Sequence, residues 1–76
     1  MKISLDDVSY QVFIAQISKC GAQVKVLDPQ NQEHWVGFDE SDVMGLYDED
    51  GELFPAAGDL LAKWAAESIH EDRNKK

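Results

Sequence analysis

The chain has few of the features from which small proteins draw extra stability or chemistry. It has 76 residues, a single cysteine and two prolines, and its longest unbroken apolar run is Val12–Ala15. One thiol cannot form an internal disulfide, and four apolar residues cannot span a bilayer. The first residues contain no apolar stretch of the kind that marks a signal peptide. We therefore expect a cytoplasmic protein that does not enter a membrane, with Cys20 as a small buried hydrophobe.

Positive charge is also scarce. Seven Lys and Arg face fifteen Asp and Glu, which gives a net charge of −8, and no Lys or Arg lies between Lys25 and Lys63. The acidic residues inside that window are Asp28, Glu33, Asp39, Glu40, Asp42, Asp48, Glu49, Asp50, Glu52 and Asp59. Direct binding to nucleic acid or anionic lipid needs positive charge and is not expected. A partner protein with a basic surface, such as a nucleic-acid-binding protein, is expected instead.

Motifs for catalysis and metal binding are missing as well. The segment Asp48–Glu52 has the acidity of a calcium loop, but placing Gly51 at the sixth position puts Leu46 first and Ala57 twelfth, and neither side chain can coordinate an ion. There are no close-spaced Cys and His pairs for zinc, no Gly-x-Ser-x-Gly elbow and no phosphate-binding glycine loop. We predict no catalytic residue, no metal, no cofactor and no enzymatic activity.

What the chain does contain is enough apolar material for one core. Hydrophobic residues make up 43% of it, and we expect a single domain over residues 1–73 with a frayed basic tail over 74–76. Residues 8–20 alternate in a way that favours a strand. Ser4 followed by Asp7 nevertheless resembles a helix capping box, so a helix over residues 5–20 stays open.

The remaining elements are clearer. Residues 22–38 predict a hairpin with a turn at 28–31. Residues 39–58 predict either irregular structure or one short helical turn around 42–46, followed by a turn at 50–51. A helix is predicted from an N-cap at Gly58–Asp59 to about Arg73. Its apolar face is expected to consist of Leu60, Leu61, Trp64, Ala65, Ser68 and Ile69. Trp64 is assigned to the core, whereas Trp35 fits either the core or the surface.

These elements predict an α+β fold, a small antiparallel β-sheet (meander or hairpin) packed against one C-terminal α-helix. The order becomes helix-hairpin-helix if residues 5–20 are helical. Both belong to the same fold class.

The concentration of acid in the middle of the chain suggests a binding function. The candidate partner-binding residues are Asp39, Glu40, Asp42, Tyr47, Asp48, Glu49, Asp50 and Glu52. Carboxylates on a rigid domain can imitate a phosphate backbone, which carries one charge per roughly 3.4 Å of each strand. In size and charge, though not in any motif, the chain is similar to phage-encoded anti-defence proteins, including some anti-CRISPR and anti-restriction proteins. That likeness implies an inhibitor or modulator that occupies a nucleic-acid-binding surface.

A different class of function fits the same composition. The acid would then only keep the protein soluble, and an accessory or structural module would bind through an apolar helix face or a sheet edge. A homodimer formed through a sheet edge is one version of this alternative. Tyr47, an aromatic anchor in the first hypothesis, would simply cover the edge of the sheet in the second.

Overall fold

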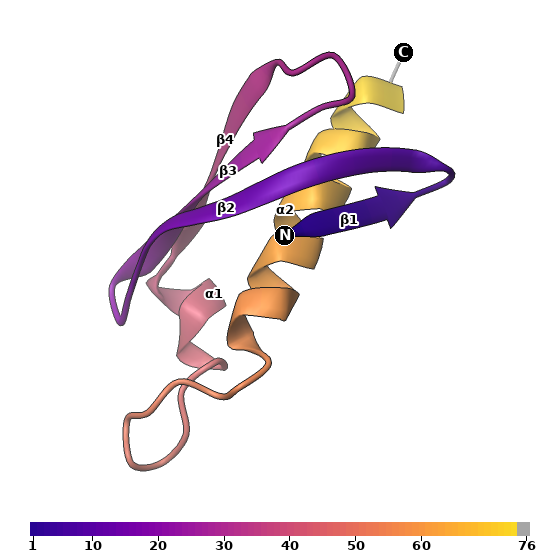
Figure 1. Cartoon of the computed structure of the whole chain (residues 1–76). Coiled ribbons are helices and arrows are strands. Elements are labelled where there is room, and N and C mark those ends of the chain that lie inside the picture. The colour runs from indigo at the N-terminus through magenta and orange to yellow at the C-terminus, as the bar shows by residue number, and fades with distance from the viewer. Residues whose placement is uncertain (75–76) are drawn as a thin grey trace.

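The computed structural model describes residues 1–74 of the chain. Its elements are β1 (Lys2–Leu5), β2 (Val8–Ser18), β3 (Gly21–Leu27), β4 (Glu33–Asp39), α1 (Glu40–Met44) and α2 (Ala57–Asn74). The four strands form one antiparallel sheet in sequence order, and α2 packs across one face of it (Figure 1). The predicted α+β fold is confirmed, and the helical alternative for residues 5–20 is wrong.

The first hairpin, formed by β1 and β2, was not predicted from the sequence. β1 pairs with β2 so that Leu5 lies opposite Val8, and only Asp6 and Asp7 separate them. These two residues have φ angles of 51° and 66°. Positive φ at both central positions characterises the type I′ turn, whose twist matches that of the flanking strands. Asp tolerates this conformation better than most residues, so the spacing that resembles a capping box belongs to a hairpin turn.

The second and third hairpins bring β2, β3 and β4 together. Cys20 lies in the two-residue turn between β2 and β3 and is exposed, so its assignment as a buried hydrophobe was wrong. Gly21 follows with a φ of 149°, and a Cβ built there would lie 2.5 Å from the carbonyl oxygen of Phe38. Glycine thus permits the close approach of β4. The predicted hairpin over residues 22–38 is confirmed by the antiparallel register of β3 and β4.

α2 begins before the predicted N-cap. It starts at Ala57, and the N–H of Leu60 donates to the carbonyl oxygen of Ala56 at 3.0 Å, so Gly58–Asp59 lies inside the first turn and is not the N-cap. Asn74, assigned to a frayed tail, is helical; Lys75 and Lys76 of that tail lie outside the described residues. Within residues 1–74, no helix is both long enough and apolar enough to cross a membrane.

The core lies between the sheet and α2, and it is closed at one end by residues in and just after α1. It consists of Tyr10, Val12, Ala22, Val24, Val26, Val43, Leu46, Ala57, Leu61, Ala62, Ala65, Ala66 and Ile69. Many of the helix residues are alanines, which allow the helix axis to approach the sheet closely. The buried stripe is therefore rotated from the predicted one. Leu60, Trp64 and Ser68 are exposed, and the ring of Trp64 packs against Phe38 with the centroids 6.2 Å apart.

Candidate partner-binding surface

Residues 39–52, here called the acidic end, lie at one end of an elongated molecule of 40 × 20 × 19 Å (Figure 1). The segment comprises α1 and a loop whose two sides are joined by a bridge between Tyr47 and Leu53. It holds all eight predicted partner-binding residues, seven of which are carboxylates, and it contains no Lys or Arg. The segment is contiguous in sequence, so the fold keeps this charge in one place.

Two of the carboxylates hold the start of α1. Oδ1 of Asp39 accepts from the N–H of Asp42 at 3.1 Å, and Oδ2 of Asp42 accepts from the N–H of Asp39 at 3.2 Å, which makes a reciprocal capping box. The hydroxyl of Ser41 also donates to Oδ1 of Asp39 at 2.7 Å. The Ser41 hydroxyl and the Asp42 amide hold the pKa of Asp39 below its ordinary value. Asp39 and Asp42 therefore have a folding role whatever the function.

The carboxylate of Asp48 stabilises the loop in the same way, by accepting hydrogen bonds from backbone N–H groups. Its Oδ1 accepts from the N–H groups of Asp50 at 3.0 Å and Glu52 at 2.9 Å, and its own N–H donates to the carbonyl oxygen of Glu52 at 2.8 Å. Gly51 supplies the positive φ of 80° that lets the chain reverse. The loop backbone is thus fixed by local hydrogen bonds rather than by burial.

Four carboxylates of the acidic end are exposed and are not used in this way. Among residues 1–74, the side chains of Glu40, Glu49, Asp50 and Glu52 form no hydrogen bond or ion pair. Their charges are held on a rigid backbone and directed at solvent. Of the predicted set, these four are the residues with charge available for a partner.

A hollow of about 300 Å³ adds apolar and cationic groups to this surface. It is lined by Lys19, Glu40, Met44, Tyr47, Asp48, Glu49 and Gly51. Met44 is 64% exposed, the highest value among the large hydrophobic residues, and Tyr47 is half-buried against the core. Nζ of Lys19 lies 5.9 Å from the centroid of the Tyr47 ring. Sequence reasoning missed Lys19, because the β2–β3 turn reaches the loop only in three dimensions, and Met44, because its exposure depends on which side of α1 faces the core.

The predicted residues do not all face the same way. Asp39 and Asp42 line a different hollow, of about 490 Å³, between α1 and the β2–β3 turn, together with Cys20 and Phe38. Glu40, Asp48 and Glu49 line the hollow described above. α1 therefore divides the acidic end into two sides.

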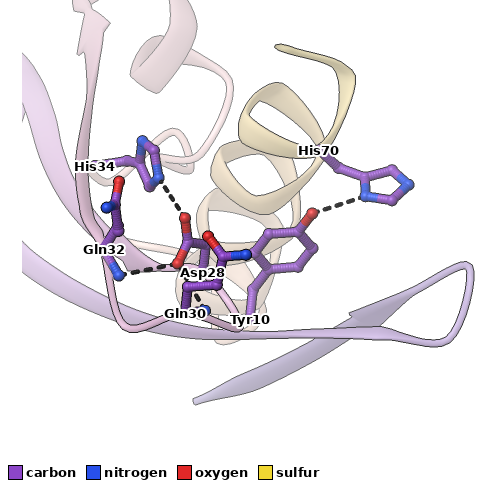
Figure 2. Close-up of polar contacts among 6 residues, drawn as sticks. All are labelled: Tyr10, Asp28, Gln30, Gln32, His34 and His70. Atoms are coloured by element: carbon purple, nitrogen blue, oxygen red, sulfur yellow. Dashed lines mark hydrogen bonds and ion pairs between the residues drawn. The ribbon is translucent and has the colours of Figure 1, made fainter. Parts of the chain in front are cut away.

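A buried carboxylate outside the acidic end, that of Asp28, stabilises the β3–β4 turn. Asp28 is 7% exposed, and its carboxylate accepts from the N–H groups of Gln30 and Gln32, each at 2.9 Å, and from Nε2 of His34 at 3.0 Å (Figure 2). The His34 side chain and the Gln32 amide are the main reasons that the pKa of Asp28 lies below its ordinary value. The cluster satisfies Asp28 completely and closes the hairpin.

The second histidine connects α2 to the first hairpin. The buried Tyr10 hydroxyl donates to Nδ1 of His70 at 2.8 Å, and Nε2 of His70 donates to Oδ2 of Asp6 at 2.9 Å (Figure 2 shows the first contact). This assignment follows from chemistry, since an ionised carboxylate can only accept. The chain of contacts joins residues sixty or more positions apart and satisfies the hydroxyl of Tyr10 in the core.

No described helix packs on the sheet face opposite α2, here called the open face (Figure 1). Phe13, Lys25 and Trp35 are direct cross-strand neighbours on this face, from β2, β3 and β4. Phe13 is 44% exposed and Trp35 is 57% exposed, and Nζ of Lys25 lies 4.9 Å from the centroid of the Phe13 ring. Trp35, which fitted core or surface, belongs to the surface.

In the described part of the chain, no group of three or more His, Cys, Asp or Glu residues could hold a metal ion. In the same range, every buried side-chain nitrogen and oxygen has a hydrogen-bond partner, so no orphaned polar atom points to a ligand. No family model, curated protein or solved structure matches the chain.

Proposed function

We propose that this protein is a non-catalytic binding protein whose acidic end contacts a basic surface of a partner protein. This partner surface normally binds a nucleic-acid backbone, so the protein inhibits or modulates the partner by occupying it. The observation that carries the proposal is the gathering of seven carboxylates, with no Lys or Arg among them, in residues 39–52 at one end of the molecule. A phage anti-defence or anti-CRISPR inhibitor of the nucleic-acid-mimic type would act in this way.

The internal bonds of the acidic end support this proposal. Asp39, Asp42 and Asp48 fix the backbone, so little backbone conformational entropy is lost when the exposed carboxylates bind. A rigid array of charges is what a set of Lys and Arg side chains evolved for phosphates would recognise. Met44 and Tyr47 would add apolar contact inside the charged rim, the arrangement common in binding hot spots.

The second candidate function is an interaction module that binds through an apolar surface. Exposure of Phe13 and Trp35 on the open sheet face favours it specifically. The two functions use different surfaces, the acidic end and the open sheet face, and can coexist. They differ in their response to salt, because exposed charge contacts are screened within about 8 Å at physiological ionic strength.

The test compares two charge-reversed variants. One carries Glu49→Lys, Asp50→Lys and Glu52→Lys in the acidic end. The matched control carries Glu67→Lys, Glu71→Lys and Asp72→Lys on the exposed side of α2, and therefore has the same net charge. Immobilised wild type and variants are incubated with host lysate at low and high salt, and retained proteins are identified by mass spectrometry.

We expect wild type and the α2 control to retain a basic nucleic-acid-binding protein at low salt and to release it at high salt or on addition of DNA or RNA. The acidic-end variant should retain at least tenfold less of it, since several charge contacts are reversed. A partner that the folded acidic-end variant retains as well as wild type would sink the proposal. Retention that does not change with salt or nucleic acid would contradict it equally.

A further inference from the structure

The open face of the sheet differs in chemistry from the rest of this acidic molecule. Its central row is Phe13, Lys25 and Trp35, and a neighbouring row across all four strands is Lys2, Gln11, Leu27 and Glu33. A third row contains Gln16, Gln23 and Gly37. Across these three rows the only acidic residue is Glu33, in a chain with a net charge of −8. Repulsion between two copies is therefore weak across these three rows.

The face is also apolar beyond its two aromatic rings. Leu27 is half-buried, yet it is not among the side chains that pack against the core, so its partial burial occurs on the open side. Lys25 lies beside Phe13, and its Nζ is 3.5 Å from Oε1 of Glu33. The one cation in the centre of the face is thus already paired and could be covered at lower cost than a free charge.

The row from Lys2 to Glu33 is self-complementary. It is positive at the β1 edge and negative at the β4 edge of the same sheet. Two such sheets packed face to face about a two-fold axis parallel to the strands place β1 over β4 of the second copy and β2 over β3. Each row then lies over itself in reverse order, as a two-fold interface requires.

From this placement we propose that the open sheet face is a homodimer interface, in which two copies pack face to face about a two-fold axis parallel to their strands. Lys2 of each copy meets Glu33 of the second copy, and Phe13 meets Lys25 of the second copy. An axis perpendicular to the strands through the same row would instead put Lys2 over Lys2 and Glu33 over Glu33. Charge therefore favours the axis parallel to the strands. The twist of packed sheets rotates the strands of the two copies by only about 30°, so the long Lys2 and Glu33 side chains can still reach each other.

The area of the face sets the strength of the dimer. Four strands about 4.8 Å apart and three rows about 7 Å apart cover roughly 400 Å² on each copy. The total of about 800 Å² is smaller than the interfaces of stable complexes and is in the range of weak, transient ones. We therefore expect a reversible dimer rather than an obligate one. The axis also brings both acidic ends to the same end of the dimer, so salt should strengthen dimerisation by screening their repulsion.

The first test is sedimentation velocity on the full chain from about 1 µM to about 1 mM, at low and high salt. We expect a monomer–dimer equilibrium that shifts toward dimer as salt rises. Phe13→Thr and Trp35→Thr should each weaken dimerisation by roughly tenfold or more, whereas Met44→Thr, which removes an exposed apolar side chain elsewhere, should not. A chain that stays monomeric to about 1 mM, and so leaves the face to another partner or to solvent, overturns the proposal. So does a dimer that Trp35→Thr and Phe13→Thr leave unchanged.

The second test examines the axis with two charge-reversed proteins, Lys2→Glu and Glu33→Lys. Each alone places like charges at both edge contacts and should dimerise more weakly than wild type. In an equimolar mixture the two edge contacts of the mixed dimer are both attractive, so the mixture should dimerise more strongly than either variant alone. A nonspecific effect of net charge would instead favour the Glu33→Lys protein by itself, because it is the least acidic. That result would exclude the strand-parallel axis.

Dimerisation through the open face and binding through the acidic end involve different residues, so each can be absent while the other is present. The dimer is measured on purified protein without a partner. The lysate experiment uses substitutions at the acidic end, which lies outside the three rows of the open face.

Discussion

At the scale of single residues, the polar groups that do most for the structure are those that accept several hydrogen bonds. Asp28 takes three, from two backbone N–H groups and one histidine, and Asp48 takes two. Each of these residues closes a turn whose backbone donors would otherwise lack a partner. Several acids of this chain therefore have structural reasons to be acidic, apart from any charge that they show to a partner.

Asp28 leads to a prediction about pH. Its pKa is lower in the folded protein than its ordinary value of 3.8, so between the two values the unfolded chain binds the extra proton. The stability that it contributes is complete above about 3.8 and is lost as the pH falls through the lowered folded pKa. Asp28→Asn removes this contribution. Urea unfolding should show wild type more stable than Asp28→Asn at neutral pH, with the gap narrowing in strong acid.

Glu52→Gln is a useful comparison for that measurement. The side chain of Glu52 forms no hydrogen bond among the described residues and is exposed. Its difference from wild type should be small at every pH. A gap between wild type and Asp28→Asn that stays constant down to pH 2, or widens in acid, would contradict the role assigned to the Asp28 carboxylate.

At the scale of elements, the two glycines of the β3–β4 pair have different roles. A Cβ on Gly21 would lie 2.5 Å from a backbone oxygen of β4, at a φ that L side chains rarely adopt, whereas a Cβ on Gly37 would meet nothing within 4 Å. Gly21→Ala should therefore destabilise the fold by about 1–3 kcal/mol, the usual cost of such backbone strain. Gly37→Ala should be neutral or stabilise by up to about 1 kcal/mol, because it reduces the entropy of the unfolded chain.

Thermal and urea denaturation of both variants measures this difference directly. Equal effects of the two substitutions would mean that β3 and β4 do not pair in the register that places Gly21 opposite Asp39. The comparison therefore tests the register of the sheet as well as the space around each glycine.

The same elements show what the sequence could predict. The alternation in residues 8–20, the central hairpin and the C-terminal helix were all visible as patterns, and each was confirmed. β1 was missed because it has only four residues and because its turn, Asp6–Asp7, contains neither Gly nor Asn. The face of α2 was misplaced because large residues such as Trp64 suggested the core, whereas the sheet accepts a stripe of alanines at closer range.

The sequence likewise predicted one part of the candidate surface and not the other. The carboxylates of the acidic end are contiguous, so composition alone located them. The place of Lys19 depends on the approach of the β2–β3 turn to the loop, and the exposure of Met44 depends on which side of α1 faces the core. The open face likewise depends on which side of the sheet α2 covers. Features formed by neighbouring residues can be recognised in the sequence, whereas contacts between elements that are distant in the chain cannot.

At the scale of the whole molecule, the uneven charge should affect stability as well as binding. Screening lengths fall from about 10 Å at 0.1 M salt to about 3 Å at 1 M, so added salt weakens repulsion within a charge cluster. Seven carboxylates lie within residues 39–52, and Lys19 is the one Lys or Arg that lines the hollow beside Glu40, Asp48 and Glu49. We expect the wild-type melting temperature to rise by a few degrees between about 0.1 M and 1 M NaCl, measured in the low micromolar range.

The two charge-reversed variants separate a local cause from a global one. Three reversals add two charges each, so the acidic-end variant and the α2 control both change from −8 to −2. If the repulsion resides in the acidic end, the first variant should lose most of the rise with salt, whereas the α2 control should keep most of it. If only the net charge matters, the two should lose it equally, and the acidic end would then be no more strained by its charge than the rest of the surface. KCl should reproduce the NaCl curve, because screening depends on ionic strength and not on the identity of the cation.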